Sequence, residues 1–184
     1  MPRFEVSATG LAGLKLVQRQ LRVDSRGFFS RFFCAEELRL AGFAQPVAQI
    51  NHTLTRQRGT VRGMHFQHPP HGEDKLVSCL RGEIFDVAVD LRRDSPTFLQ
   101  WHAEVLSSEN GRSLLIPKGF AHGFQTLDDD TELLYLHSTP YVQSSEGGLN
   151  PADPALAIDW PLPLGELSAR DAGHALLTPE FRGV

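Results

Sequence analysis

The chain has 184 residues and a mass of 20.4 kDa, which is enough for one domain with a sizeable hydrophobic core. Hydrophobic residues make up 41% and charged residues 22%, as in an ordinary globular protein, and the formal net charge of −4 excludes a general field that attracts nucleic acid or anionic membranes. Any anionic ligand must therefore be bound by a local cluster of cations.

Short apolar segments that favour β-strands dominate the chain, and Gly, Pro, Asp or Asn separates most of them. Turn signals recur at short intervals, a rhythm that is typical of a β-sandwich or barrel. Besides a strand position around His65, the predicted strands cover residues 14–21, 27–33, 75–80, 83–91, 98–106, 112–117, 123–127 and 132–142.

The segment 83–91 shows regular alternation. Two sets of side chains face opposite sides of such a strand: Ile84, Asp86, Ala88 and Asp90 on one, and Phe85, Val87, Val89 and Leu91 on the other. This pattern predicts an antiparallel strand with one buried face.

The helical signals are weak and peripheral. Residues 34–42 are the helical candidate of the first half, with Ala35, Leu38 and Leu40 partly in phase and Gly42 as a C-terminal stop. From residue 143 the chain is rich in Pro and Gly, which predicts loops and short helical turns. We therefore predict an all-β protein with a few short peripheral helices. We expect a single domain over 1–184, in which 143–184 wraps around the sandwich.

The cysteines and the N-terminus predict a cytoplasmic protein. Cys34 and Cys79 lack the spacing of metal ligands, and MPRFEVSATG lacks the apolar core of a signal peptide. No apolar stretch approaches the ~18 residues that a membrane span needs. We expect a reducing environment, with neither membrane nor nucleic acid as a partner.

Titratable residues crowd the segment VRGMHFQHPPHGEDKLV, residues 61–77, and a metal site is one explanation. Small double-sheet β-domains often hold a metal through two histidines one residue apart on a strand, a carboxylate and a later histidine. Here Gln67 occupies the second position after His65, although His122 could be the later ligand. The other histidines of the segment stand in a Pro-rich loop beside Lys75, whose charge opposes a cation. We therefore expect no catalytic metal.

Proton transfer next to a carbonyl group is the second explanation. It needs a base of near-neutral pKa, an orienting carboxylate, a positive charge for the developing oxyanion and an acid on the opposite side. His65, Asp171, Lys75 and Tyr135 can supply these four functions. Taken singly, each also has an ordinary structural explanation as a barrel histidine, a helix-capping aspartate, a solvated lysine and a packed tyrosine.

Arginines are candidates for a phosphate-binding site, because the planar fork of a guanidinium group matches phosphate oxygens. Arg26, Arg62 and Arg170 are the candidates. Their significance depends on whether the fold brings them together.

A series of motifs carries a more specific signal. In chain order they read DSRGFF, QIN, VRGMHFQ, KLV, GEIFDVAVDLRRDSPTF, IPKGFAHGF, LLY, SSEGG, AIDWP and LSARD. Over roughly residues 14–172 they closely resemble the dTDP-4-dehydrorhamnose 3,5-epimerase family, whose members invert carbons flanking the ketone of a dTDP-4-keto-6-deoxyhexose. The resemblance implies a cupin-like jelly roll without metal or other cofactor. It also implies a homodimer in which N-terminal strands are exchanged and each subunit helps complete its partner's site.

The resemblance also implies roles for particular residues. His65 matches the base, Asp171 the carboxylate that orients it, Tyr135 the opposing acid, and Lys75 the cation that stabilises the enolate. The residues that resemble the family's substrate contacts, with the arginines directed toward the diphosphate, are Arg26, Gln49, Asn51, Arg62, His122, Glu146 and Arg170.

Two departures from the family pattern concern substrate contacts. Arg31 stands where the family usually has a glutamate, and Arg170 replaces the lysine of its LS-x-KD motif. Single epimerisation at C3 or C5, or ketoisomerisation of a related nucleotide sugar, therefore stays open beside double epimerisation. A non-catalytic sugar-binding cupin is the alternative of another class, because it would need the arginines but not His65. We expect no necessary role for the remaining histidines: His52, His68, His71, His102, His137 and His174.

Overall fold

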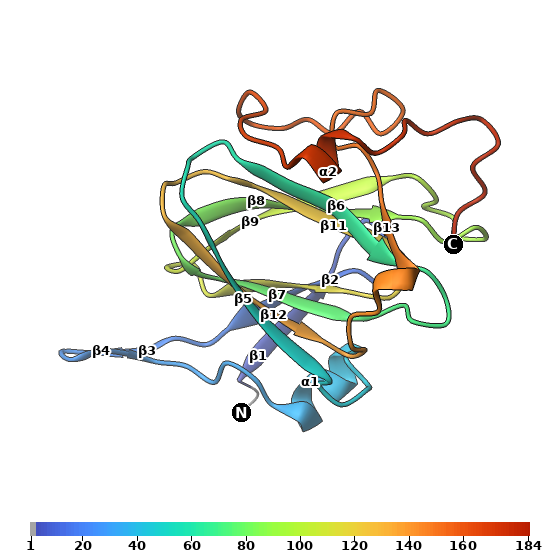
Figure 1. The fold of residues 1–184 in the computed structure, drawn as a ribbon. Coiled ribbons are helices and arrows are strands. Elements are labelled where there is room, and N and C mark those ends of the chain that lie inside the picture. The colour runs from blue at the N-terminus through green and yellow to red at the C-terminus, as the bar shows by residue number, and fades with distance from the viewer. Residues whose placement is uncertain (1–2) are drawn as a thin grey trace.

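The computed structural model describes residues 3–184 and contains two antiparallel sheets that pack face to face (Figure 1). The six-stranded sheet has the order β1 (Phe4–Ala8), β2 (Lys15–Arg19), β10 (Arg112–Ile116), β7 (Lys75–Arg81), β12 (Thr131–His137) and β5 (Gln49–Thr55). The five-stranded sheet has the order β13 (Glu146–Gly148), β6 (Val61–Gln67), β11 (Phe120–Thr126), β8 (Glu83–Asp90) and β9 (Trp101–Ser107). This architecture confirms the prediction of an all-β, cupin-like double-sheet fold.

Among the residues that the structure describes, three short helical elements lie outside the sheets: α1 (Ala35–Ala41), the 3-10 turn Gln143–Ser145 and α2 (Ala169–Ala172). The predicted helix at 34–42 is confirmed as α1, and Gly42 ends it with a positive φ of 120°. Its buried face carries Leu38 and Ala41, whereas Leu40 is 74% exposed, so the expected phase was wrong by one residue. No helix within residues 3–184 has the length and hydropathy required to cross a membrane.

Apolar side chains form three layers. The middle layer lies between the sheets and includes Leu14, Val77, Ile84, Leu114, Phe120, Phe124 and Leu133. A lower layer packs α1 against the outer face of the six-stranded sheet through Leu38, Ala41, Val17, Leu76 and Leu136. An upper layer packs the C-terminal wrap, here residues 149–184, against the outer face of the five-stranded sheet through Leu149, Leu156, Met64, Phe66, Val87 and Val89 (Figure 1).

The upper layer explains one wrong expectation. The strand β8 is buried on both faces, because Ile84 and Ala88 point between the sheets while Val87 and Val89 contact the C-terminal wrap. The wrap, which follows β8 by more than fifty residues in the printed sequence, covers the wholly apolar face, and the face that also carries Asp86 lies between the sheets. Local alternation carries no information about such a distant partner.

Other strand boundaries also differ from expectation. The predicted strand 132–142 ends at His137, ahead of Pro140, which has no N–H to donate. The predicted strand 27–33 is shortened to β4 (Gly27–Phe29), which pairs with β3 (Arg22–Asp24). The strands β1, β3, β5 and β13 were not predicted.

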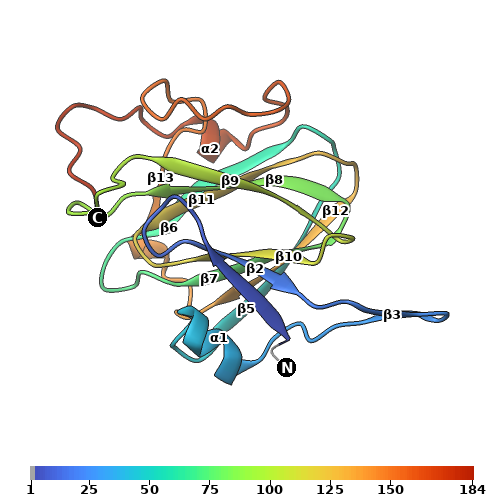
Figure 2. The same cartoon turned by 180° about the vertical axis from the view of Figure 1, so that it is seen from behind.

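The β3–β4 hairpin, residues 22–29, projects from the body of the molecule as an arm (Figures 1 and 2). Three of its apolar side chains are open to solvent: Val23 is 76%, Phe28 59% and Phe29 68% exposed. Such a concentration of exposed aromatic surface on a two-stranded ribbon is typical of surfaces that bind other proteins.

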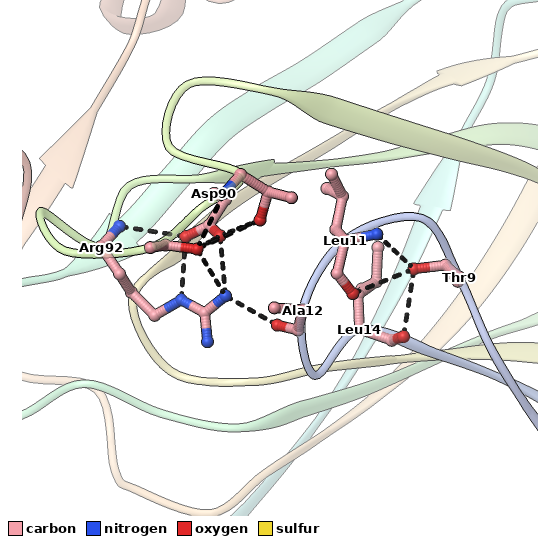
Figure 3. A network of polar contacts seen from close by, with 8 residues as sticks. Thr9, Leu11, Ala12, Leu14, Asp90 and Arg92 are labelled. Carbon is pink, nitrogen blue, oxygen red and sulfur yellow. Dashed lines mark hydrogen bonds and ion pairs between the residues drawn. The ribbon is translucent and has the colours of Figure 1, made fainter.

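A polar network holds the turn after β8 (Figure 3). The carboxylate of Asp90 accepts hydrogen bonds from the Arg92 guanidinium at 2.7 and 2.8 Å, from Ser95 Oγ at 2.5 Å and from Thr97 Oγ1 at 2.7 Å. Burial by itself raises the pKa of Asp90, but these donors outweigh it and lower the pKa to about 2. Because Arg92 also donates to the carbonyl oxygen of Ala12, the network ties this turn to the β1–β2 hairpin.

Candidate active site

Two adjoining cavities lie on the inner side of the sheets. The first has a volume of about 630 Å³ and receives Arg62, His65 and His122 from the five-stranded sheet and Lys75 and Tyr135 from the six-stranded sheet. The second, of about 460 Å³, shares His65, Lys75, Asn51 and His137 with the first and extends to Gln49, Tyr141 and Glu146. The two spaces therefore meet beside His65 and Lys75.

Strand register determines which side chains face the cavities. His65 on β6 is the cross-strand partner of His122 on β11, and Lys75 on β7 is the partner of His137 on β12. Met64 and Phe66, the neighbours of His65, point to the upper apolar layer, so His65 itself points between the sheets. Tyr135 precedes His137 by two residues and shares its inward face.

A β-bulge between β6 and β11 brings Arg62 and His65 into the same cavity. In a regular strand two residues that are three apart face opposite sides of the sheet. The register shifts between His122 and Phe124, and Gly63 adopts φ +129° at this point. A Cβ on Gly63 would overlap the backbone of Gly123, so the close approach of the two strands requires glycine.

His65 and Asp171 form a hydrogen-bonded dyad. Nε2 of His65 lies 2.8 Å from Oδ1 of Asp171, which comes from α2 in the C-terminal wrap. The backbone N–H of Gly63 donates to the other oxygen of Asp171 at 3.2 Å, and the N–H of Asp171 donates to Ser168 Oγ at 3.0 Å. These contacts fix the carboxylate, which in turn fixes the imidazole.

The dyad keeps His65 suited to act as a base. Burial lowers the pKa of His65, and the hydrogen bond and charge of Asp171 oppose this without reversing it. A neutral imidazole is therefore available near neutral pH. For Asp171, burial favours a higher pKa, but the contacts with His65 and Gly63 outweigh it, and the pKa is lowered. Asp171 thus stays charged and is placed to stabilise an imidazolium at His65.

Lys75 is a buried cation beside the dyad. The residue is 7% exposed, and its Nζ lies 3.0 Å from Oε1 of Glu73 and 3.5 Å from the carbonyl oxygen of His65. A fixed ammonium group in such a dry place stabilises a developing oxyanion more strongly than water does.

Tyr135 faces the first cavity from the six-stranded sheet, whereas His65 faces it from the five-stranded sheet. Burial raises the pKa of its hydroxyl, which lies 3.5 Å from Thr53 Oγ1, so the phenol is protonated and can serve as an acid. The ring of His122 lies 6.0 Å from the ring of Tyr135. His122 in turn contacts Asp86 at 2.7 Å, and burial raises the pKa of that carboxyl despite the opposing charge of His122.

A chain of oriented amides runs between the cavities. Gln49 accepts from the N–H of Tyr141 at 3.0 Å and donates to Asn51 Oδ1 at 2.9 Å, which leaves the amide nitrogen of Asn51 facing Nε2 of His137 at 3.4 Å. His137 therefore accepts a hydrogen bond as a neutral ring. Burial, followed by the charges of Lys75 and His122, lowers the pKa of His137 to about 4, which is consistent with that role.

The structure brings together all of the predicted site residues except Arg26. Arg62, His122 and Arg170 line the first cavity, Gln49 and Glu146 line the second, and Asn51 lines both. Arg26 lies at the tip of the β3–β4 arm, where its side chain is 86% exposed and pairs with Asp24 at 2.6 Å. Arg31 pairs with Glu37 at 2.8 Å and does not line either cavity.

Four of the remaining histidines have structural contacts away from the dyad. His71 bonds Ser145 at 2.8 Å, His68 packs on Phe66, and His52 and His102 pair with Glu132 and Glu104 on their own sheets. His137 lines both cavities, and the ring of His174 lies 6.5 Å from the ring of His65. His137 could have been found from its spacing of two residues after Tyr135 on a strand, whereas His174 follows the end of α2, and no local spacing places it.

Comparison with known proteins places this geometry in a family. The sequence profile described as dTDP-4-dehydrorhamnose 3,5-epimerase matches residues 8–178. The chain belongs to this family. Its members are isomerases that act on carbohydrates as epimerases, and the resemblance seen in the motifs is thereby confirmed.

Individual relatives cover nearly the whole chain. The dTDP-4-dehydrorhamnose 3,5-epimerase of Salmonella typhimurium is 42% identical over 174 residues, which is 94% of each chain. The dTDP-4-dehydrorhamnose 3-epimerase of Streptomyces niveus is 40% identical over 94% of this chain and 83% of its own. The crystal structure of a Legionella pneumophila 3,5-epimerase in complex with dTDP-4-keto-L-rhamnose has a TM-score of 0.89 and 42% identity, with 94% and 92% of the two chains covered.

Proposed function

We propose that this protein inverts C3 and C5 of a dTDP-4-keto-6-deoxyhexose by proton removal and return on opposite faces of an enolate. The observation that carries the proposal is the placement of His65 and Tyr135 on two facing sheets across one cavity. A single base returns a proton to the face from which it came, so inversion requires a second proton carrier on the other side.

Each step uses a group that the site holds in position. The ring nitrogen of His65 that Asp171 leaves free takes the proton from the carbon next to the ketone, and the C–H electron pair moves onto the ketone oxygen. Lys75 stabilises that oxyanion. Tyr135 then gives its proton to the opposite face of the carbon, and exchange with solvent restores neutral His65 and protonated Tyr135.

The same arrangement supports a nucleotide-sugar substrate. Arg62 and Arg170 bring two guanidinium groups to the first cavity, which suits a diphosphate, and the second cavity offers Tyr141 as an aromatic surface for a base. The Legionella relative, which holds dTDP-4-keto-L-rhamnose, supports this choice of ligand. The replacement of the family's lysine by Arg170 keeps the charge at this position.

Incubation with dTDP-4-keto-6-deoxyglucose in heavy water, followed by NMR, tests the proposal. Deuterium should enter at both C3 and C5 with inversion, and His65→Ala should abolish both exchanges. Exchange at one carbon alone would establish the single epimerisation that the Streptomyces niveus relative is named for. A protein that binds the nucleotide sugar but exchanges neither hydrogen would be a sugar-binding cupin, and the proposed reaction would be wrong.

We also propose a homodimer in which the β3–β4 arm of each chain reaches the partner's site. The exposed apolar side chains of Val23, Phe28 and Phe29 support a protein contact there, and Arg26 lies at the same tip, too far out to serve its own cavities. Mixing Arg26→Ala chains with His65→Ala chains tests this arrangement. Mixed dimers contain one site with both residues intact, so activity should exceed that of either variant alone, whereas a monomer shows no such recovery.

The expected cytoplasmic setting is retained as part of this proposal. Cys34 and Cys79 are both free thiols, as a reducing compartment favours.

A further inference from the structure

His174 lies beside the dyad, and the proposed reaction does not use it. Its Nε2 is buried and makes no hydrogen bond to any residue that the structure describes. The ring occupies space that Gly148 leaves free, because a Cβ on Gly148 would overlap the imidazole. A buried nitrogen without a partner is unfavourable, so its presence next to two other potential ligands calls for an explanation.

The three side chains form a compact donor set. Among residues 3–184, one group of potential ligands has its ligand atoms within 4.8 Å of one another, and it consists of His65, Asp171 and His174. Two imidazoles and one carboxylate with a fourth position open are the donor set of exchangeable zinc sites, and they favour zinc over magnesium. With zinc bonds of about 2.0–2.2 Å, the ligand atoms of a tetrahedral site lie about 3.3–3.6 Å apart. The most distant pair would therefore close by up to about 1.5 Å, and the 2.8 Å contact between His65 and Asp171 would open by less than about 1 Å.

We propose that His65, Asp171 and His174 form an inhibitory site for zinc. The ion would be held by the base and by the carboxylate that orients it, so proton removal would stop while zinc is bound. This site differs from the metal centre that the sequence pattern raised, because it does not include His122 and because it blocks the reaction.

Arg170 is the natural competitor of the ion. Its Nη2 lies 2.9 Å from His65 Nε2 and its Nε 3.4 Å from Asp171 Oδ1, so the guanidinium group occupies the place of a cation beside the dyad. The side chain is 52% exposed and also bonds Glu146 at 2.7 Å, so it can withdraw toward Glu146 without leaving a buried charge. Zinc binding and the Arg170 contact are therefore mutually exclusive.

Calorimetric titration of chelator-treated enzyme with zinc chloride tests the site in the absence of substrate. Wild-type protein should bind one zinc per chain. His174→Leu removes one of the three ligands and should weaken zinc binding at least ~10-fold, because loss of a residue that only hydrogen-bonds a ligand already costs about 10–100-fold. The matched control is His102→Leu, which removes a histidine that lies outside the donor set and pairs with Glu104 at 3.0 Å. The His102→Leu protein should bind zinc with the affinity of the wild type. Titration of the wild type with magnesium chloride should show no binding at the site.

Two further measurements keep the proposal falsifiable. Zinc should inhibit epimerisation by the wild type, and His174→Leu should keep the basal activity but require at least ~10-fold more zinc for the same inhibition. Arg170→Gln, which removes the competing cation, should bind zinc more tightly. Equal zinc binding by wild type and a folded His174→Leu, or no tightening in Arg170→Gln, would overturn the proposal. If His174→Leu fails to fold, the result with Arg170→Gln decides.

Discussion

Replacement of Asp171 by asparagine tests the dyad most directly. The substitution keeps the size of the side chain and removes its charge. The carboxylate lies 2.8 Å from His65 Nε2, and its side chain is only 3% exposed. A hydrogen bond to a charged group contributes about 1.5–3 kcal/mol. Because the imidazolium exists only after proton removal has begun, this loss raises the barrier, and at about 1.36 kcal/mol per factor of ten kcat should fall roughly 10- to 150-fold.

The pH dependence gives this variant a second signature. Asp171 raises the pKa of His65 against the effect of burial, so removal of its charge should lower that pKa further. The base must be neutral to act. The acid limb of the kcat/KM profile should therefore move to lower pH while the maximum rate falls.

The assay is product formation followed by NMR over a pH series. The matched control is Asp153→Asn, which alters another buried aspartate of the C-terminal wrap, one that binds the N–H groups of Ala155 and Leu177 and does not line either cavity. The control should keep wild-type kcat and pH profile. A folded Asp171→Asn enzyme with unchanged kcat and an unmoved acid limb would refute the assigned role.

Four other perturbations follow from the same geometry. Tyr135→Phe should slow inversion by about 10²–10⁴-fold while deuterium still enters the substrate, as NMR in heavy water will register. Lys75→Met, made together with Glu73→Gln so that no buried carboxylate is left unpaired, should reduce kcat by about 10²–10³-fold in steady-state assays with KM changed far less. His137→Leu removes the acceptor for the amide chain and should raise KM more than it lowers kcat, and His137→Gln should restore KM. The pKa of Asp90 is about 2, below the ordinary value, so its contribution to folding is complete above pH ~4 and is lost as the pH falls toward 2. Denaturant titrations should show a weaker loss of stability over that interval for Asp90→Asn than for the wild type.

Much of the fold could be predicted from local pattern because most strands end at Gly, Pro or Asp turns. Segments 75–80, 83–91 and 112–117 correspond to β7, β8 and β10. The pattern failed where burial depends on distant residues. Both faces of β8 are covered because the C-terminal wrap returns over it.

In the candidate site, too, some residues could be predicted from local motifs, and the positions of others depend on distant parts of the chain. His65, Lys75, Tyr135 and Asp171 could be named from motifs whose order and composition are specific. The position of His174 depends on how the wrap crosses Gly148, which no strand pattern encodes. The distance of Arg26 from its own cavities depends on the direction of the β3–β4 arm, which the motif around it does not specify.

The late position of Asp171 in the chain separates the two sheets of the site from the carboxylate beside His65. Both sheets have all but three of their residues by β12, yet the orienting carboxylate is translated well after them. The wrap also supplies Glu166, Ser168 and Arg170 to the first cavity. A chain shortened before the wrap therefore lacks one wall of that cavity as well as the carboxylate beside His65, and it leaves the apolar surface of Val87 and Val89 open to solvent.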